Sequence, residues 1–300
     1  MSLGAFLMLK TAAALIIASA VAASAEDWRV EVLDPAIYAG AMVETGDKAP
    51  DGLPDGLIAY AEGDIHAAWF VSPTRRYAHG ILGDAIEAGG LRVRTDQGDE
   101  LTIDLPDSMV FEDRTPRIVD LNGDGRNEVI AIRSSRRSGA GGAVYGLREG
   151  RLTLVAETEF IGRTNRWLNI AAIADITGDG ISDIAFVRTP HIGGALRLFR
   201  FKDGLTLVDE INGFSNHAIG SPEQRMSAVA DIDGDGDMEI AVPDDSRTTL
   251  RIIDYRGGLT EVASIDLPQR IIGPVLTEGE GADARFIIRL RDGVIIAVTR

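Results

Sequence analysis

Short runs of alternating apolar and polar residues recur along the chain, separated by turns rich in glycine and aspartate. Alternation with a period of two is typical of a half-buried β-strand, because successive side chains point to opposite faces of a sheet. Paired runs joined by glycine-bearing turns predict β-hairpins at residues 142–157, 195–209 and 249–265. The pattern therefore predicts an all-β chain.

The predicted strands group into units of four. The units are expected at about residues 57–105, 117–157, 169–209, 226–265 and 273–300. A fixed period of this size indicates a repeat architecture. The last unit lacks a fourth strand, and the isolated alternating run at residues 28–33 would supply it and leave no open sheet edge. We therefore expect five four-stranded units in a single domain spanning residues 26–300.

Three units contain a nine-residue stretch rich in acids and glycine between their first two strands. We name these the Asp120 loop (residues 120–128), the Asp175 loop (175–183) and the Asp231 loop (231–239). Oxygen-bearing side chains stand at positions 1, 3, 5 and 9, and glycines at positions 4 and 6. Ca²⁺ takes about six to eight oxygen ligands in irregular geometry. Carboxylates this close together would repel one another without a cation, so the pattern predicts calcium binding.

Two other interpretations of these loops are available. An EF-hand needs a glutamate at position 12 and a helix on each side, whereas position 12 here is Ala131, Phe186 or Val242 and the flanks alternate as strands do. The loops could also be metal-free turns, because Asp and Gly favour turns in any case. An acid at position 9 in all three copies argues against that second alternative.

The Asp120 loop, with the apolar residues after it and Gly141–Tyr145, resembles the FG-GAP/VCBS-type repeats of integrin α-subunit propellers. The resemblance implies a β-propeller with Ca²⁺ bound in the hairpin between the first two strands of a blade. With five units, the expected fold is a five-bladed propeller of four-stranded blades, closed by an N-terminal strand that completes the last blade.

The resemblance also implies three calcium sites and their ligands. The side-chain ligands would be Asp120, Asn122, Asp124 and Glu128; Asp175, Thr177, Asp179 and Asp183; and Asp231, Asp233, Asp235 and Glu239. Backbone oxygens of Arg126, Ile181 and Asp237 would complete the three shells. Thr177 offers only a neutral hydroxyl, so we expect the Asp175 loop to bind calcium least tightly.

A second group of polar residues occupies loops at the opposite ends of the predicted strands. The planar arginine fork suits bidentate capture of carboxylate, sulfate or phosphate, so we expect this face to bind an acidic glycan, a small anion or an acidic protein segment. The candidate residues are Arg75, Arg76, His79, Arg117, Arg136, Arg137, Arg166, Trp167, Arg188, His191, His217, Arg225 and Arg247. Structural ion pairs with nearby acids such as Glu112 and Asp113 remain the alternative use of these arginines.

Catalysis by the same face is the second functional hypothesis. The chain has no cysteine, no Gly-x-Ser-x-Gly elbow, no HExxH sequence and no phosphate-binding glycine loop. Some propellers with such repeats are polysaccharide lyases or hydrolases. Clustering of the loop histidines with Tyr77 in one pocket would favour an enzyme over a binding or scaffolding module.

Composition and the N-terminal residues bear on the partners, the stability and the cellular location of the protein. A formal net charge of −16 argues against nucleic-acid binding, and without cysteine no disulfide can stabilise the fold. Lys10, a following apolar run and Ala23-Ser-Ala25 predict a cleaved signal peptide at residues 1–25. An uncleaved anchor is the alternative. We expect a periplasmic or extracellular protein without stable membrane insertion after cleavage.

Overall fold

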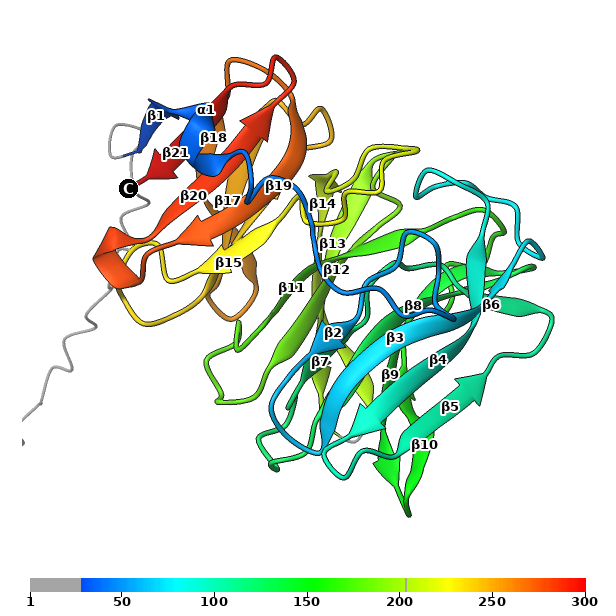
Figure 1. The fold of residues 1–300 in the computed structure, drawn as a ribbon. Coiled ribbons are helices and arrows are strands. Elements are labelled where there is room, and N and C mark those ends of the chain that lie inside the picture. Colours follow the sequence, from blue (N-terminus) through cyan, green and yellow to red (C-terminus); the bar gives the residue numbers. More distant parts are fainter. Residues whose placement is uncertain (1–27, 203) are drawn as a thin grey trace, which may run out of the picture.

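The computed structural model describes residues 28–202 and 204–300, which are folded almost entirely as β-strands. The strands form three four-stranded sheets and one nine-stranded sheet, and every strand pair is antiparallel (Figure 1). The all-β prediction is confirmed. The signal peptide predicted at residues 1–25 lies outside the described residues, and within them no helix is long and apolar enough to cross a membrane.

The nine-stranded sheet contains two of the predicted four-stranded units. The first comprises β2 (Ala59–Tyr60), β3 (Ile65–Thr74), β4 (Glu87–Thr95) and β5 (Glu100–Asp104). The second comprises β7 (Arg117–Val119), β8 (Glu128–Ser135), β9 (Gly139–Arg148) and β10 (Arg151–Glu157). The short strand β6 (Met109–Phe111) pairs with both β4 and β8 and joins the two units into one sheet. Three residues are too few to show an alternating pattern, so the sequence did not predict β6.

The next two sheets follow the chain in order. One comprises β11 (Leu168–Ala174), β12 (Asp183–Arg188), β13 (Gly194–Phe201) and β14 (Leu205–Phe214). The other comprises β15 (Ala228–Ala230), β16 (Glu239–Pro243), β17 (Thr249–Tyr255) and β18 (Leu259–Asp266). Each strand pairs with the next one along the chain, as expected for consecutive hairpins.

The last sheet joins the two ends of the described chain. Its strands are β19 (Ile271–Glu278), β20 (Arg285–Leu290), β21 (Ile295–Thr299) and β1 (Arg29–Leu33), with β1 next to β21. The pairing runs from Arg29 opposite Thr299 to Leu33 opposite Ile295. The predicted closure of the last unit by an N-terminal strand is therefore confirmed, and the arrangement of the sheets is propeller-like.

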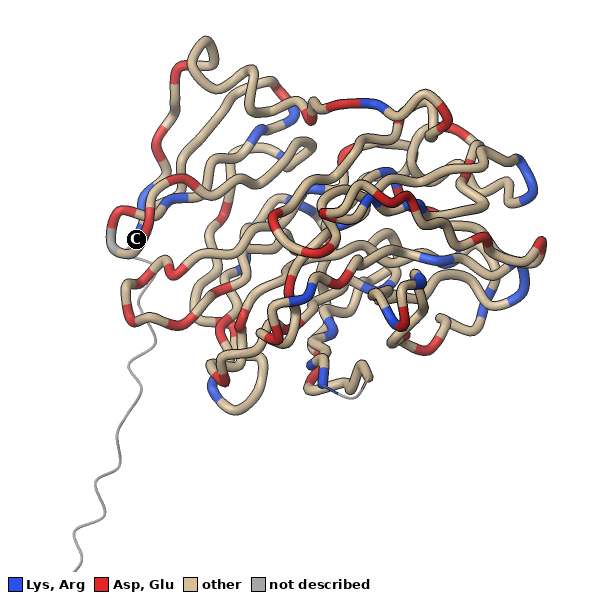
Figure 2. The backbone as a smooth tube through the Cα atoms, turned by 60° about the horizontal axis from the view of Figure 1, so that its bottom comes forward, with Lys and Arg blue, Asp and Glu red and all other residues tan. Residues whose placement is uncertain are grey.

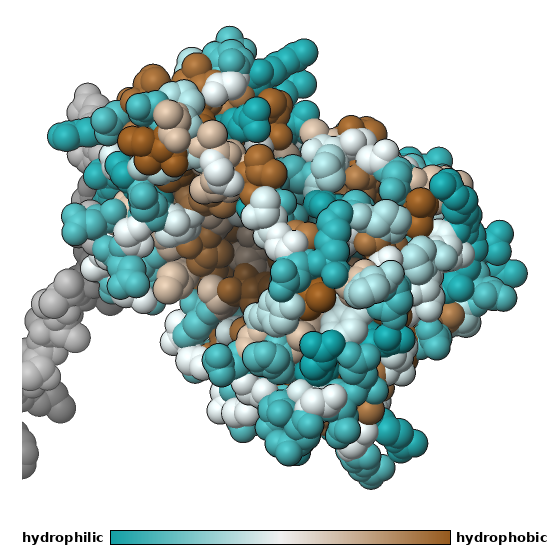
Figure 3. All heavy atoms as spheres, in the orientation of Figure 1, coloured by the Kyte–Doolittle hydropathy of each residue, from teal (hydrophilic) through white to brown (hydrophobic). Residues whose placement is uncertain are grey.

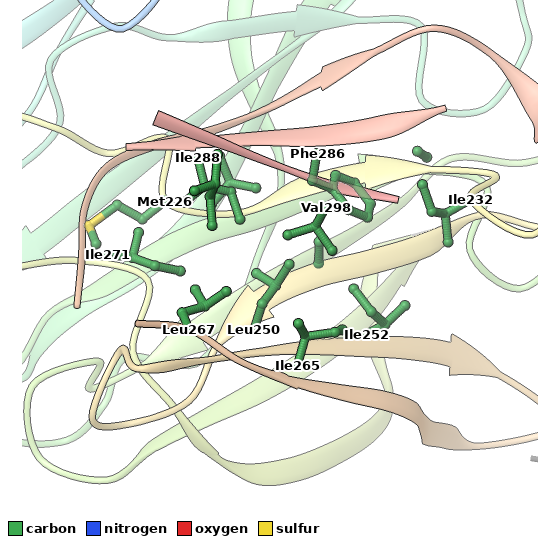
Figure 4. Close-up of a cluster of buried hydrophobic side chains, with 14 of the residues drawn as sticks. Met226, Ile232, Leu250, Ile252, Ile265, Leu267, Ile271, Phe286, Ile288 and Val298 are labelled. Atoms are coloured by element: carbon green, nitrogen blue, oxygen red, sulfur yellow. The ribbon is translucent and has the colours of Figure 1, made fainter. Parts of the chain in front are cut away.

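Neighbouring sheets pack face to face through buried apolar side chains. Between the last two sheets, Leu250 and Ile252 of β17 face Phe286 and Val298 of β20 and β21 (Figure 4). Similar clusters join the two halves of the nine-stranded sheet and each following pair of sheets. Full burial of one such side chain stabilises the fold by about 1.5–3 kcal/mol, so these clusters hold the sheets in place.

Residues 34–58 cross from the last sheet to the first (Figure 1). The segment begins with the short helix α1 (Pro35–Tyr38) and contains the buried Met42, which packs on Ile287 and Ile295 of the last sheet. Ala49 and Ile58 pack on the face of β3. The segment therefore covers apolar faces of both sheets. The molecular surface is hollowed and partly apolar between the last sheet and the first (Figure 3).

Candidate metal centre and ligand pocket

The three acidic loops lie in a row at one end of the sheets. The backbone N–H of Asn127 donates to Asp64 Oδ1 in the β2–β3 hairpin at 2.7 Å. The N–H of Ser182 donates to the carbonyl of Leu121 at 3.0 Å, which links the Asp175 loop to the Asp120 loop. Gly178 lies beside Asp237, so the row continues to the Asp231 loop. Each loop is thus positioned by its neighbour.

All three loops share two kinds of internal hydrogen bond. The first aspartate of each accepts from the N–H of the glycine at position 6, at 2.8 Å in the Asp120 and Asp175 loops and 3.1 Å in the Asp231 loop. That glycine has a positive φ in every loop, between 81° and 97°, which side chains disfavour. The aspartate at position 5 accepts from the N–H two residues later. The repeated sequence therefore makes the same tight turn three times.

The ninth residue of each loop is a buried carboxylate that opens the second strand. Glu128 and Asp183 are fully buried and Glu239 is 1% exposed. Glu128 Oε2 accepts from the N–H of Leu121 at 3.1 Å, and Glu239 Oε2 from that of Ile232 at 2.9 Å. Asp183 is one methylene shorter, and it accepts from the N–H of Thr177 at 3.0 Å.

The second oxygen of the carboxylate at position 9 lacks a hydrogen-bond partner in two of the loops. Among the described residues, Glu128 Oε1 and Asp183 Oδ1 have no hydrogen-bond partner. Burial raises the pKa of Glu128 to about 7 and that of Glu239 to about 8, and it also raises the pKa of Asp183. Unsatisfied buried carboxylate oxygens are costly. A hard cation satisfies such oxygens, and Ca²⁺ or Mg²⁺ fits this donor set.

The Asp231 loop has the most convergent ligand set. One oxygen each of Asp231, Asp233 and Glu239 lies within 4.8 Å of the others, so the three can hold one metal ion. After burial, carboxylates of the loop and the nearby Asp254 raise the pKa of Glu239 further. The guanidinium of Arg300 contacts Asp233 at 2.5 Å.

Arginine contacts differ between the other two loops. In the Asp120 loop, Asn122 Oδ1 accepts from the N–H of Asp124 at 3.0 Å, and no ion pair involves its carboxylates among the described residues. In the Asp175 loop, the guanidinium of Arg200 on β13 donates to Thr177 Oγ1 and pairs with Asp179. Sequence reasoning missed Arg200. Counting outward from the β12–β13 turn would have placed Arg200 opposite Asp183.

At the opposite ends of the strands, predicted ligand residues form an aromatic cluster. Trp167 is 2% exposed and His217 fully buried. The rings of Trp167 and His191 are stacked, with centroids 6.3 Å apart and 9° between their planes. The rings of Trp167 and His217 meet edge to face, with centroids 4.7 Å apart. His191 Nε2 and His217 Nδ1 are 2.9 Å apart, and His217 Nε2 is 2.9 Å from the carbonyl of Ser221.

Burial sets the charge of the two histidines, and their hydrogen bonds set which ring nitrogen carries the proton. Burial lowers the pKa of His191 to about 4 and that of His217 to about 3, so both are neutral near pH 7. A carbonyl can only accept, so His217 Nε2 donates to Ser221 and His217 Nδ1 accepts from His191 Nε2. His191 Nδ1 is then left as an acceptor.

A pocket of about 120 Å³ opens beside this cluster, and its lining includes His79, Trp167 and His191. His79 Nδ1 is 2.5 Å from Oε1 of the fully buried Glu112, which also accepts from Ser134 Oγ. A second pocket of about 370 Å³ is lined by Arg247 and Arg270, and both pockets include His191. The two pockets adjoin at His191, and we call them together the His191 groove.

The structure does not bring all the predicted ligand-face arginines together. Those paired with acids are Arg76 with Asp107, Arg117 with Asp113, and Arg225 with Glu223. Those donating to backbone carbonyls are Arg166, Arg188 and Arg247. Among the described residues, the side chains of Arg75, Arg136 and Arg137 are exposed and make no hydrogen bond or ion pair. Acidic and basic positions are interspersed over the molecule (Figure 2).

Comparison with known proteins identifies the repeats. The FG-GAP-like repeat family matches the chain twice, at residues 120–186 and 175–242. The chain therefore contains FG-GAP-like repeats, and the resemblance expected from the sequence is confirmed. No curated protein sequence matches significantly.

Two solved structures match the chain at low sequence identity. A crystal structure of BBS1N in complex with ARL6DN, soaked with mercury, is 11% identical, with a TM-score of 0.43 over 82% of this chain. A crystal structure of the same complex soaked with lead is 12% identical, with a TM-score of 0.40 over 71% of this chain. The chain spans 66% and 57% of the length of those two chains.

Proposed function

We propose that this protein is an exported, calcium-stabilised, five-bladed β-propeller that serves as a binding module. The five-blade count is supported by dividing the nine-stranded sheet at β6, which leaves five units of four strands. Calcium in the acidic loops is supported by one observation above all. Glu128, buried at the start of β8, has a carboxylate oxygen without a hydrogen-bond partner, and, after burial, the nearby carboxylates of Asp124 and Asp120 raise its pKa.

In this proposal calcium has a structural role. In the Asp120 and Asp231 loops, the residues that would hold it are the side chains at positions 1, 3, 5 and 9 and the backbone oxygen at position 7. The bound ion supplies positive charge to carboxylates that otherwise repel one another. The loops bury little apolar surface, since their positions 3 to 7 are largely exposed, so metal contacts would fix hairpins that packing does not.

The His191 groove is the proposed ligand site on the opposite face. Arg247 and Arg270 line it, beside one acid, Asp245, and neither arginine has an ion-pair partner among the described residues. The largely buried Trp167 lies against His191 at its aromatic side. Two neighbouring guanidinium groups favour an anion. We therefore propose a small anion, an acidic glycan or an acidic protein segment as the ligand. The net charge of −16 opposes nucleic acid, and the protein is proposed to act in the periplasm or outside the cell.

The tryptophan in the groove provides the test. Sulfate and an oligogalacturonate should be titrated in calcium and in chelator while tryptophan fluorescence is followed. Arg247→Gln should weaken binding by about tenfold, the value of one charge-assisted hydrogen bond. The control Arg136→Gln removes an exposed arginine without contacts and should leave binding unchanged. Equal affinity in both variants, or no binding of either anion, would reject this ligand site.

An enzyme acting on acidic polysaccharides is the second candidate, favoured by the His79–Glu112 pair. Glu112 orients His79 through Nδ1 and leaves Nε2 for proton transfer in a pocket that also contains His191. The ring of Tyr77 lies 5.9 Å from that of His79. Cleavage of a polyuronate, seen as new absorbance from unsaturated ends or as new reducing ends, should vanish in His79→Gln. Absence of cleavage over several polyuronates would exclude this candidate.

A further inference from the structure

We propose that the Asp175 loop carries an internal cation, the guanidinium of Arg200, in place of a divalent ion. The chain would then have two calcium loops and one arginine-filled loop. This inference rests on the proposed calcium binding by the Asp120 and Asp231 loops. It differs from the sequence expectation, which gave the Asp175 loop a weak calcium site because Thr177 is neutral.

The position of Arg200 follows from sheet register. Arg200 of β13 is the cross-strand partner of Asp183, the ninth residue of the Asp175 loop. Its guanidinium Nη2 donates to Thr177 Oγ1 at 2.5 Å and lies 3.0 Å from Asp179 Oδ2. Its Nε lies 3.8 Å from Asp183 Oδ1, the buried oxygen without a hydrogen-bond partner. One guanidinium thus contacts the side chains at positions 3, 5 and 9.

In the Asp120 loop, among the described residues, no arginine contacts the side chains at positions 3, 5 and 9. The cross-strand partner of Glu128 is Gly146, which has no side chain to reach the loop. Two residues further on, the guanidinium of Arg148 donates to the carbonyl of Leu147 at 2.9 Å. No arginine pairs with the carboxylates of this loop among the described residues. Burial raises the pKa of Glu128, and the charge of Arg148 opposes that shift but forms no ion pair with Glu128, so the carboxylate oxygens of this loop stay open to an external cation.

The Asp231 loop also differs from the Asp175 loop. Arg300 contacts a single predicted ligand there, Asp233. Near Glu239 stands another acid, Asp254, which itself pairs with Arg256 at 2.5 Å. Three carboxylates of this loop converge within 4.8 Å. Negative charge is thus concentrated in this loop and partly neutralised in the Asp175 loop.

Arginine and calcium are mutually exclusive at these oxygens. Ca²⁺ needs its ligands at about 2.3–2.6 Å, and the nitrogens of Arg200 already contact oxygens of the same side chains. An ion entering would also meet a like charge at close range. Thr177 suits the arrangement because a hydroxyl accepts from a guanidinium and adds no charge to be balanced. Replacing Arg200 would free three oxygen donors for a metal.

Calcium stoichiometry of the full chain, measured by calorimetric titration after chelator treatment, tests the proposal. The wild-type protein should bind two ions, and Asp179→Asn should still bind two because that loop holds none. Arg200→Gln should bind three. The matched control Arg197→Gln, on the same strand but paired with Glu210, should bind two. Arg200→Gln should also melt at a lower temperature than wild type in chelator and recover in calcium.

Three results would overturn the inference. If the wild-type protein binds three ions, or loses one on Asp179→Asn, the Asp175 loop holds calcium and only this inference fails. If Arg200→Gln folds and still binds two, the arginine is not what excludes the ion. If the wild-type protein binds no calcium, the proposed function fails together with the inference.

Discussion

Glu239 accepts a hydrogen bond from the backbone N–H of Ile232 at 2.9 Å, and this bond links the first residue of β16 to the opening of the Asp231 loop. The same carboxylate lies within 4.8 Å of Asp231 and Asp233 oxygens. One oxygen of Glu239 therefore serves the hairpin backbone, while the carboxylate also belongs to the metal-binding group. The loop turn and its capacity for metal depend on the same buried side chain.

Glu239→Gln is expected to separate these two roles. The amide oxygen can still accept from Ile232, but the buried charge is lost. In chelator the variant should be about 1 kcal/mol more stable than wild type, because no charge or proton has to be held in the buried site. In calcium it should be less stable than wild type. Urea unfolding in both conditions measures this.

The control for Glu239→Gln is Glu62→Gln, which neutralises an exposed acid on the β2–β3 hairpin, outside the Asp231 loop. Its free energy of unfolding should stay within about 0.5 kcal/mol of the wild-type value in both chelator and calcium. Equal calcium stabilisation of Glu239→Gln and wild type would show that Glu239 is not a metal ligand.

Calcium affinity of the Asp231 loop should increase with pH up to about 8. Burial raises the pKa of Glu239 to about 8, so below that pH a proton must leave before calcium can bind. The affinity should rise by up to about tenfold per pH unit between pH 6 and 8 and then level off. Titration calorimetry of Asp120→Asn, which removes a ligand of the other calcium loop, isolates this site. A pH-independent affinity would contradict the burial of the ligand.

The pH dependence of stability in chelator should depend on Glu87, a residue outside the metal loops. Glu87 is 3% exposed, and burial followed by the nearby Glu112 raises its pKa to about 9. The folded state thus binds a proton that the unfolded state releases near pH 4.5. The contribution of this proton to the free energy of unfolding is complete below pH 4.5. It is lost as the pH rises from there through 9, by up to about 1.4 kcal/mol per pH unit. Glu87→Gln should flatten the profile of urea midpoints from pH 5 to 9, and an unchanged slope would refute the assignment.

The crossing segment at residues 34–58 should contribute to global stability. Met42 is 3% exposed and packs on the last sheet, whereas its neighbour Val43 is 55% exposed. Met42→Ala should lower the free energy of unfolding by about 2–4 kcal/mol. Val43→Ala should change it by less than about 0.5 kcal/mol. If both substitutions have the same small effect, the segment does not close the structure.

The sequence predicted the strands well because their signals are local. Alternation within β9 or β17, and the glycine turns that follow them, depend on adjacent residues only. The pairing of β1 with β21 was predictable by elimination, since one strand lacked a unit and one unit lacked a strand. The loops were recognisable because their acids and glycines are fixed by the turn itself.

Features that depend on packing could not be predicted. Strand β6 has three residues, and its two partners come from different units. Met42 is one apolar residue in a segment of mixed composition. Trp167 was expected at an exposed ligand face and is buried against His191 and His217, because rings from separate loops meet there. The contacts of Arg200 depend on the register between β12 and β13, which the residues adjacent to it in sequence do not reveal.

Thermal unfolding of the full chain in calcium, in magnesium and in chelator tests the central claim most directly. An ion that binds only the folded state at 100 times its Kd stabilises it by about 2.7 kcal/mol per site. For a chain of this size each kcal/mol raises Tm by about 2–4 °C. We predict that calcium raises Tm by at least about 5 °C over chelator and by more than magnesium does. Identical Tm values in all three conditions would contradict calcium as a structural part of this fold.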